Sequence, residues 1–257
     1  MSIKDQLSDY FDNFDGYGIY YEGPWLFYRQ KYVDYIKKEF CEKKNIRVLD
    51  LGCGRMCSFP SLLNMKGLVL YQCVDSSHKS TETLRSKLCN SPNVRVDEAD
   101  LLDFVARCDE KFDVVILFGV IMYLDREDVM DLFSKMGRIL TDDSLIVLHE
   151  PNEKAASMLD PHSQVFTANM IKKCQDRLEG NYRVDIRTYN ITLLRKLCRK
   201  ALAIGRKISK IVKNDCRIRS SAAMTIQSTV WRLEVGVESR LSNLMVGCDS
   251  WITLRKF

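Results

Sequence analysis

The chain has 257 residues, of which 46% are hydrophobic and 28% charged, and its formal net charge at pH 7 is +5. These values are ordinary for a globular protein, and the length suffices for one large α/β domain or for a core domain with an insert. The N-terminal residues contain no apolar segment of the kind found in secretory signals, and no stretch approaches the roughly 18 uninterrupted apolar residues that span a bilayer. We therefore expect a cytoplasmic protein without a transmembrane segment.

The ten cysteines are scattered through the expected strands and helices, without a Cys-x-x-Cys pair, and the chain has three histidines. This pattern favours reduced thiols in the core over disulfides or a zinc site. We expect no metal site.

Residues 1–45 are rich in aromatic side chains and are expected to be partly helical. Glycine and proline residues interrupt the aromatic stretch that contains Tyr20 and Tyr21, which indicates a loop or a short helical turn. These tyrosines could form a lid over a ligand or pack against the core. Apolar residues then recur at helical spacing and predict a helix from Tyr28 to Phe40 that packs on a sheet.

From residue 46 onward, expected strands alternate with helical stretches near 78–89, 101–108, 127–138 and 164–178. Seven strands are expected, at Arg47–Leu51, Gly67–Asp75, Val94–Glu98, Phe112–Phe118, Ser144–His149, Tyr182–Thr188 and Ser250–Arg255. This alternation predicts a Rossmann-like α/β fold, in which helices flank a seven-stranded, mostly parallel sheet. Four parts follow: an N-terminal lid (1–45), an α/β core (46–189), a helical insert (190–247) and the final strand of the core (248–257).

The insert between strands six and seven contains a basic amphipathic stretch. From Leu193 to Val212, apolar residues at helical spacing alternate with lysines and arginines, among them Arg199. Such a helix can contact a membrane surface, a nucleic acid or an acidic ligand, or it can pack on its own domain with a solvated basic face. If strand six is parallel to its neighbours, the insert leaves from the carboxyl ends of the strands and would lie beside a ligand there.

The first strand runs directly into a glycine turn, Gly52-Cys53-Gly54. The two glycines can adopt backbone angles that are closed to other residues, and they let a ligand approach the main chain without meeting a Cβ. The stretch Ser58–Leu63 could begin a helix whose free N–H groups face that ligand. A strand, a glycine turn and a helix start are the parts of a nucleotide-type binding site.

Acidic residues follow the next two strands. Because ligands of open α/β sheets lie outside the carboxyl ends of the strands, these residues belong to one expected site. Asp75 ends strand two, where its carboxylate could accept two hydrogen bonds from ribose hydroxyls, and Asp100 after strand three could accept from an adenine amino group. Either acid alone could be a solvated loop residue, but their order along the strand ends favours a binding edge.

These residues together resemble the class I S-adenosylmethionine-dependent methyltransferases over about residues 45–150. The matching segments are Val48–Gly54, Asp75, Glu98–Leu102, Phe112–Val115 and Gly137–Leu140. The resemblance implies S-adenosyl-L-methionine as cofactor, with Gly52 and Gly54 beside its methionine part, Asp75 at the ribose, and Asp100 and Leu101 framing the adenine. The full set of expected cofactor-binding residues is Asp50, Gly52, Cys53, Gly54, Asp75, Ser76, Asp100, Leu101, Phe118 and Tyr20.

Two departures from glycine-turn patterns bear on this interpretation. Many members of the resembling family have a third glycine where this chain has Met56, which would change how the methionine carboxylate is held. A nicotinamide dehydrogenase, the competing interpretation, would need a glycine at position 57, which is Cys57. The methyl donor is therefore favoured over a nicotinamide.

Methyl transfer from a sulfonium needs mainly alignment of the acceptor and exclusion of water, and a base only where the acceptor must lose a proton. His149 at the end of strand five is the candidate base, although a histidine at such a position can equally be structural. Glu150 could bind an amine acceptor. The expected catalytic residues are thus His149 and Glu150, and the expected substrate residues are Tyr21, Tyr123 and Arg199.

We therefore expect a methyltransferase (EC 2.1.1 class) that acts on an oxygen or nitrogen of a small metabolite, which the basic insert suggests is anionic or phosphorylated. Strand four ends without the Asn/Asp-Pro-Pro-Tyr/Phe signature of enzymes that methylate amino groups of adenine, cytosine or glutamine. An RNA methyltransferase is the first alternative, since the basic insert could bind a nucleic-acid backbone. A non-catalytic cofactor-binding or partner-binding module is the second.

Overall fold

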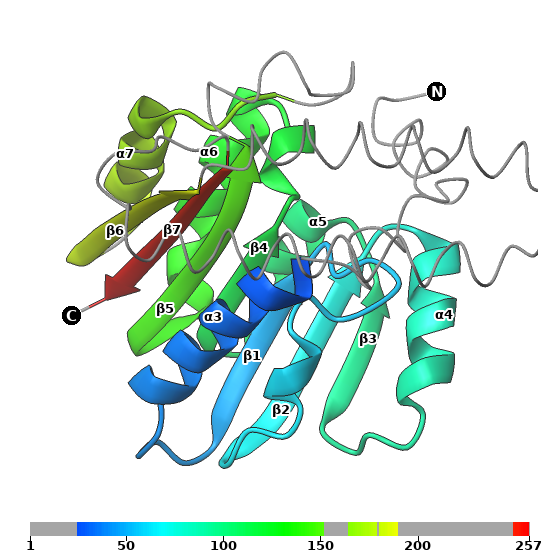
Figure 1. Ribbon diagram of the computed structural model, residues 1–257. Coiled ribbons are helices and arrows are strands. Elements are labelled where there is room, and N and C mark those ends of the chain that lie inside the picture. Colours follow the sequence, from blue (N-terminus) through cyan, green and yellow to red (C-terminus); the bar gives the residue numbers. More distant parts are fainter. Residues whose placement is uncertain (1–24, 152–163, 179, 190–248, 257) are drawn as a thin grey trace, which may run out of the picture.

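The computed structural model describes residues 25–151, 164–178, 180–189 and 249–256. Seven strands form one sheet in the order β3-β2-β1-β4-β5-β7-β6 (Figure 1). Strands β1 to β5 pair in parallel, whereas β7 pairs antiparallel with both β5 and β6. The strands are β1 (Ile46–Leu51), β2 (Leu68–Asp75), β3 (Val94–Glu98), β4 (Phe112–Phe118), β5 (Leu140–Pro151), β6 (Tyr182–Tyr189) and β7 (Asp249–Lys256). The predicted fold class is confirmed, and the predicted insert lies outside the described residues.

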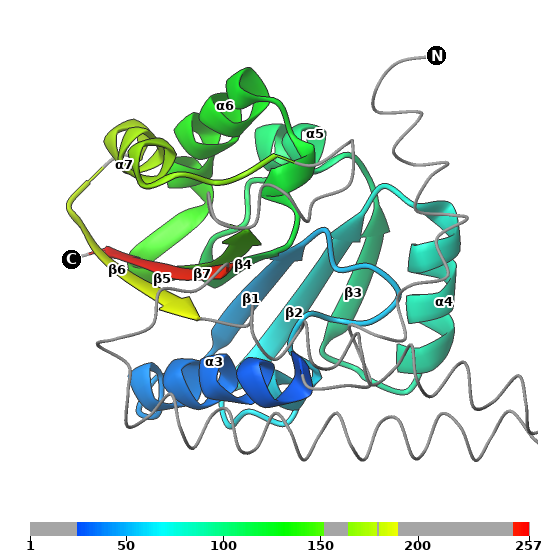
Figure 2. The same ribbon diagram turned by 45° about the horizontal axis from the view of Figure 1, so that its top comes forward.

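Helices cover both faces of the sheet, as Figure 2 shows most clearly. Side chains of α3 and α4 pack on one face, in a core cluster that also holds Val48 of β1. Side chains of α5, α6 and α7 pack on the other, in a cluster that holds Leu49. The helices are α3 (Trp25–Glu39), α4 (His78–Leu88), α5 (Leu101–Arg107), α6 (Arg126–Met136) and α7 (Ala168–Arg177), with 3-10 turns η1 (Pro60–Leu62), η2 (Ile121–Tyr123) and η3 (Gly137–Ile139).

Polar side chains fix where four of these helices begin. Ser77, Asp100, Asp125 and Thr167 each accept a hydrogen bond from a backbone N–H in the first turn of the helix that follows. The cap at Thr167 explains why α7 starts later than the predicted stretch 164–178. The residues before it are held elsewhere, since the main-chain N–H of Gln164 donates to Met122 and that of Phe166 donates to Pro151.

The helix start that we predicted at Ser58–Leu63 is wrong. A 3-10 turn of three residues, η1, stands there instead, with Pro60 at its start. The N–H groups just before it do not face outward, because that of Ser58 donates to Asp50 (2.6 Å) and that of Phe59 to the Tyr71 hydroxyl (3.3 Å). No helical N-terminus is therefore available at this point to hold a ligand.

Strand β5 is longer than predicted at both ends, since it begins at Leu140, which pairs with Phe112 of β4, and continues past His149. Glu150 and Pro151 pair with Ser250 and Asp249 of the antiparallel strand β7. Glu150 is thus a strand residue, paired on its β7 side, and not the first residue of a loop.

Strand β6 runs in the direction of β5, since both are antiparallel to β7. Pro151 of β5 and Tyr189 of β6 both pair with Asp249, the first residue of β7. Residues 190–248 consequently leave and rejoin the sheet at the carboxyl ends of β1 to β5. The sequence predicted that the segment leaves at this edge, although through a parallel pairing of strand six that the sheet does not have.

Candidate functional site

The glycine turn sits at the carboxyl end of β1 and is fastened to β2. The N–H groups of Gly52 and Cys53 both donate to the Val74 carbonyl, at 2.8 and 3.2 Å. Gly52 and Gly54 have φ of +70° and +63°, a conformation that L side chains rarely adopt. A Cβ on Gly52 would lie 2.4 Å from Cγ2 of Val120, so at this glycine the close neighbour is a side chain of the protein itself.

Asp75, the last residue of β2, ties this turn to the start of α4. Its carboxylate accepts from the Gly54 N–H through one oxygen (2.8 Å) and from the Ser77 N–H through the other (2.9 Å). The carboxylate is half-buried at the edge where the sequence placed a ribose-binding acid. One side chain thus sets the distance between the glycine turn and the loop after β2.

Asp50, in β1, binds the segment that follows the glycine turn. Its side chain is completely buried and accepts from the Ser58 N–H (2.6 Å), the Ser58 hydroxyl (2.7 Å) and the Tyr71 hydroxyl (2.8 Å). Burial raises the pKa of Asp50 to about 6, against the hydrogen bonds from Ser58 and Tyr71 and the positive charge of Arg29, which favour the ionised form. These contacts assign Asp50 to the support of the turn, and its contact with the cofactor stays a prediction.

The thiols of the turn are also buried. Cys53 and Cys57 lie against Cys73 of β2, and burial raises the pKa of Cys53 to about 12. Cys53, which the sequence placed in the cofactor site, therefore presents its main chain and not a thiolate. None of the described cysteines forms a disulfide.

Three further predicted cofactor residues, Ser76, Asp100 and Leu101, follow β2 and β3. Ser76 is exposed directly after Asp75, and Leu101 is half-buried at the start of α5. Asp100 caps α5, with its Oδ1 accepting from the N–H groups of Leu102 (2.9 Å) and Asp103 (3.2 Å). Because the Ala99 N–H donates to the Asp75 carbonyl (3.0 Å), Asp75 and Asp100 are brought to one edge.

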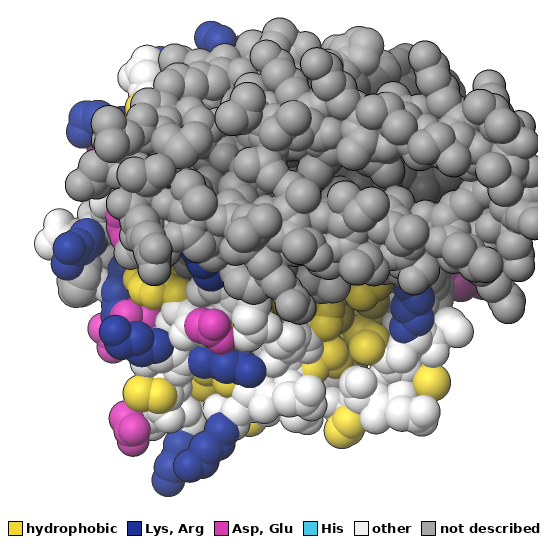
Figure 3. All heavy atoms as spheres, in the orientation of Figure 1, with side chains coloured by type: hydrophobic (Ala, Val, Ile, Leu, Met, Phe, Trp, Pro, Cys, Tyr) yellow, Lys and Arg dark blue, Asp and Glu magenta, His cyan; other side chains and the backbone are white. Residues whose placement is uncertain are grey.

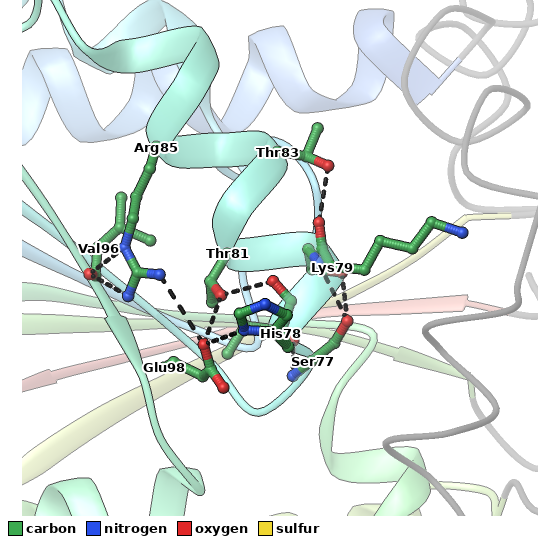
Figure 4. A network of polar contacts seen from close by, with 10 residues as sticks. Ser77, His78, Lys79, Thr81, Thr83, Arg85, Val96 and Glu98 are labelled. Atoms are coloured by element: carbon green, nitrogen blue, oxygen red, sulfur yellow. Dashed lines mark hydrogen bonds and ion pairs between the residues drawn. The ribbon is translucent and has the colours of Figure 1, made fainter.

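A polar network behind this edge fastens α4 to the end of β3 (Figure 4). Glu98 lies 2.8 Å from Nδ1 of His78 and accepts from the Thr81 hydroxyl at 3.4 Å, with Arg85 at 3.8 Å. The hydrogen bond with His78 is the main cause that lowers the pKa of Glu98. Both partners are largely exposed, so this network positions the loop after β2 without forming a buried pair.

An aromatic cluster stands at the ends of β4 and β5. The Phe118 ring stacks on the His149 ring with centroids 4.4 Å apart and an interplanar angle of 8°. Tyr32 of α3 meets His149 edge-on at 6.1 Å, and Phe59 meets Phe118 edge-on at 5.8 Å. His149 is 8% exposed, so the predicted base is a ring packed among aromatic side chains at the expected edge.

Glu150 is completely buried and accepts hydrogen bonds from three consecutive main-chain N–H groups. They belong to Val120 (3.0 Å), Ile121 (2.9 Å) and Met122 (3.1 Å). These bonds fix η2 and with it the half-buried Tyr123. The geometry favours a structural role for Glu150 over the catalytic role that the sequence predicted.

Gly119 directly follows Phe118 at the carboxyl end of β4. Its φ is +69°, and a Cβ built there would meet none of the described atoms within 4 Å. In contrast to Gly52, it borders space that the described residues leave open.

Three predicted site residues, Tyr20, Tyr21 and Arg199, lie outside the described residues. Within the described ranges, no group of three or more His, Cys, Asp or Glu side chains could hold a metal ion. None of the helices in those ranges is long and apolar enough to cross a membrane.

Sequence reasoning missed four residues that shape the site: Arg29, Ser58, Tyr71 and Val120. Arg29 had a readable signal, since it lies on the apolar stripe of the predicted helix, one turn before Tyr32. The other three had none, because their contacts with Asp50 and Gly52 join segments whose relative placement depends on the assembled sheet.

Comparisons with known proteins agree with this geometry. Residues 48–143 match a family model described as a methyltransferase domain. Comparison with curated proteins finds no match.

Several solved structures share the fold. A SAM-dependent methyltransferase from Archaeoglobus fulgidus is 18% identical with a TM-score of 0.53, over 88% of this chain and 94% of that one. The magnesium protoporphyrin IX methyltransferase of Synechocystis PCC 6803, solved with bound SAM, is 17% identical with a TM-score of 0.56, over 72% and 90%. The phosphoethanolamine N-methyltransferase 2 of Haemonchus contortus is 15% identical with a TM-score of 0.56, over 88% and 52%.

Proposed function

We propose that this chain is a class I S-adenosylmethionine-dependent methyltransferase and that it transfers a methyl group to an oxygen or nitrogen of a small, phosphorylated metabolite. The observation that carries the proposal is the Asp75 carboxylate, which joins the Gly54 and Ser77 N–H groups at the carboxyl edge of the sheet. We call the ends of β1 to β3 the donor side and the ends of β4 and β5 the acceptor side.

The donor side suits S-adenosylmethionine, which supplies an already activated methyl group. Each carboxylate oxygen can accept more than one hydrogen bond, so Asp75 can accept from ribose hydroxyls while it holds the turn. Asp100 and Leu101, which start α5 beside Asp75, would frame the adenine. The main chain of Gly52–Gly54 would border the methionine part.

The acceptor side would align the nucleophile and exclude water, which is the larger part of the protein's task in this reaction. Phe118 and His149 form its aromatic wall, and Tyr123 stands nearby on η2. Where the acceptor must lose a proton, His149 would take it, since an imidazole can exchange protons near neutral pH. The open position at Gly119 directly follows Phe118 of this wall.

The choice of a phosphorylated acceptor rests on charge and placement. Residues 193–219 are strongly basic, and the segment 190–248 leaves and rejoins the sheet at the carboxyl edge. The Haemonchus contortus protein of the same fold is named a phosphoethanolamine methyltransferase, which makes phosphorylated amines a sensible start for a screen. The buried free thiols suit the reducing cytoplasm, where we place the reaction.

The described part of one face gives no support to the RNA alternative (Figure 3). On the face shown in Figure 3, Lys, Arg, Asp and Glu side chains of the described part are interspersed, and no large basic patch stands out among them. A backbone-binding surface would instead show clustered positive charge.

The test is transfer of a labelled methyl group to pairs of phosphorylated and unphosphorylated metabolites. We expect product with phosphorylated acceptors, and we expect charge reversal at Arg199, Lys200, Arg206 and Lys207 to raise the acceptor KM while donor affinity stays unchanged. An unchanged acceptor KM in that variant would show that the basic segment does not bind the acceptor. Salt-sensitive methylation of RNA would replace the proposed acceptor, and donor binding without product from either class would support a non-catalytic module.

A further inference from the structure

Arg29 occupies an unusual place for a charged residue. It lies on the face of α3 that packs against the sheet, one turn before the buried residues Tyr32 and Val33, and it is 4% exposed. Transfer of a guanidinium from water to such a position is unfavourable unless the surroundings stabilise its charge. The position therefore calls for a physical reason.

The contacts of Arg29 reach both sides of the site. Its guanidinium carbon stands 4.6 Å from the centroid of the Phe118 ring, a cation–π contact with the acceptor side. On its other side Phe118 meets Phe59, whose N–H donates to the Tyr71 hydroxyl that bonds to Asp50. Within this cluster the positive charge of Arg29 favours the ionised form of Asp50, which supports the glycine turn on the donor side. One helical residue thus touches the aromatic wall and influences the acid under the turn.

We propose that Arg29 is a positioning residue. Packed on Phe118, it places a fixed positive charge near Asp50 and so favours the ionised form of this side chain. The ionised carboxylate in turn holds Ser58 and the glycine turn in place. The step from the turn to donor affinity rests on the proposed function. The step from Arg29 to Asp50 does not.

Ionisation matters here because of the hydrogen bonds that Asp50 accepts. A carboxylate accepts all three of its bonds, from the Ser58 N–H, the Ser58 hydroxyl and the Tyr71 hydroxyl. A protonated Asp50 must donate one hydrogen itself. The Ser58 hydroxyl can rotate to accept it, while Oδ2 still accepts from the Ser58 N–H and the Tyr71 hydroxyl. Those two bonds then lose their charge assistance, so the restraint on the turn weakens.

Arg29 contributes positive charge that favours the ionised carboxylate, in addition to the larger effect of the hydrogen bonds from Ser58 and Tyr71. Burial disfavours the ionised form, and negative charge on the surrounding thiols or on a tyrosine would disfavour it further. The groups around Asp50 are Arg29 from α3, Tyr71 and Cys73 from β2, and Cys53, Cys57 and Ser58 from the turn.

The first arm of the test needs no donor. The NMR shift of the Ser58 amide, which bonds to Asp50, is followed against pH in the wild-type protein and in Arg29→Lys, Arg29→Met and Arg29→Gln. We expect a midpoint near 6 in the wild type. Arg29→Lys should keep this midpoint, and the two neutral variants should raise it by about one pH unit. Two neutral variants are used so that failure of one to fold still leaves a measurement.

A matched control is Arg138→Met, which removes an arginine on the opposite face of the sheet whose guanidinium donates to carbonyls of Val105 and Ala106. It should leave the midpoint of the Ser58 amide unchanged. An unchanged midpoint in both neutral Arg29 variants would overturn the proposal.

The second arm measures the affinity for S-adenosylhomocysteine by calorimetry across the same pH range. In Arg29→Met we expect about fivefold weaker binding near the wild-type midpoint and recovery at higher pH, where Asp50 ionises again. A shifted amide midpoint with unchanged affinity at every pH would refute the link to the donor. Absence of binding in the wild type would count against the proposed function, and the first arm would still decide the role of Arg29.

Discussion

The donor and acceptor sides each contain a completely buried carboxylate, and the two are stabilised by different partners. Asp50 is held by the side chain and N–H of Ser58 and by the Tyr71 hydroxyl, whereas Glu150 is held by three consecutive main-chain N–H groups. Hydroxyls can rotate when an acid gains a proton, but main-chain N–H groups cannot. The comparison indicates an adjustable support under the glycine turn and a fixed one under η2.

The largest effect is expected at Glu150. Glu150→Ala would leave three buried N–H groups without their acceptor, so it should lower the free energy of unfolding by about 4 kcal/mol. Chemical denaturation of the wild type and the variant measures this loss directly.

Glu150→Gln is the matched control, because its single amide oxygen can still accept from Val120 and Ile121 while the bond to Met122 is lost. We expect intermediate stability and retained methyl transfer. A stable Glu150→Gln protein without activity would contradict the structural role and restore the catalytic one.

The next effect separates two glycines of similar backbone conformation. Gly52→Ala combines a positive φ with a Cβ that would lie 2.4 Å from Val120, whereas Gly119→Ala has the positive φ alone. We expect losses in the free energy of unfolding of about 3 kcal/mol for the first and about 1 kcal/mol for the second.

Urea unfolding of both variants tests this difference. Because Gly119 borders open space beside the expected acceptor, its alanine variant should also show a raised acceptor KM. Equal losses of stability in the two variants would mean that Val120 moves aside without cost.

Asp50 makes a smaller contribution, which depends on pH. Its folded-state pKa of about 6 lies above the ordinary value of 3.8, so its contribution to stability is fully present below 3.8 and is lost as the pH rises through 6. Lowering the pH from about 7.5 to about 5 should therefore stabilise the wild type relative to Asp50→Asn by about 1.4 kcal/mol.

Urea unfolding of both proteins at the two pH values measures this difference. Donor affinity should change in the opposite sense, falling at low pH in the wild type as the support of the turn weakens. If the stability of the two proteins changed equally with pH, the pKa of Asp50 in the folded protein would lie outside the tested pH range.

The smallest effect is expected at the network of Figure 4. His78→Ala removes a partner of Glu98, but both side chains are largely exposed, and such pairs contribute little to stability. We expect thermal unfolding and donor affinity close to those of the wild type. A large loss of donor affinity would assign His78 to the site itself.

The fold was predictable because the buried strands are short apolar runs bounded by polar and glycine residues. Strands β3 and β4 have the predicted bounds, and the edge that carries Asp75 and Asp100 was expected from the order of the strands. The C-terminal end of β5 was not predictable, because Glu150 and Pro151 become strand only through pairing with β7.

The roles of the buried carboxylates were hidden for a related reason. In the sequence, Asp50 and Glu150 are acids next to a predicted ligand edge, which suggested contact with cofactor and substrate. Their actual partners, Ser58 and Tyr71 for Asp50 and residues 120–122 for Glu150, meet them only after the chain has folded over the sheet. The local sequence around Asp50 and Glu150 therefore could not reveal these hydrogen-bond partners.

The measurement that tests the central claim most directly is calorimetric titration of the full chain with S-adenosylmethionine, S-adenosylhomocysteine and NADH, in the wild type and in Asp75→Ala. We expect both sulfur ligands to bind the wild type, NADH not to bind, and Asp75→Ala to lose at least about tenfold in affinity, because it removes an acceptor of charge-assisted hydrogen bonds. Binding of NADH, or equal affinity of the variant for the sulfur ligands, would contradict a methyl-donor site organised by Asp75.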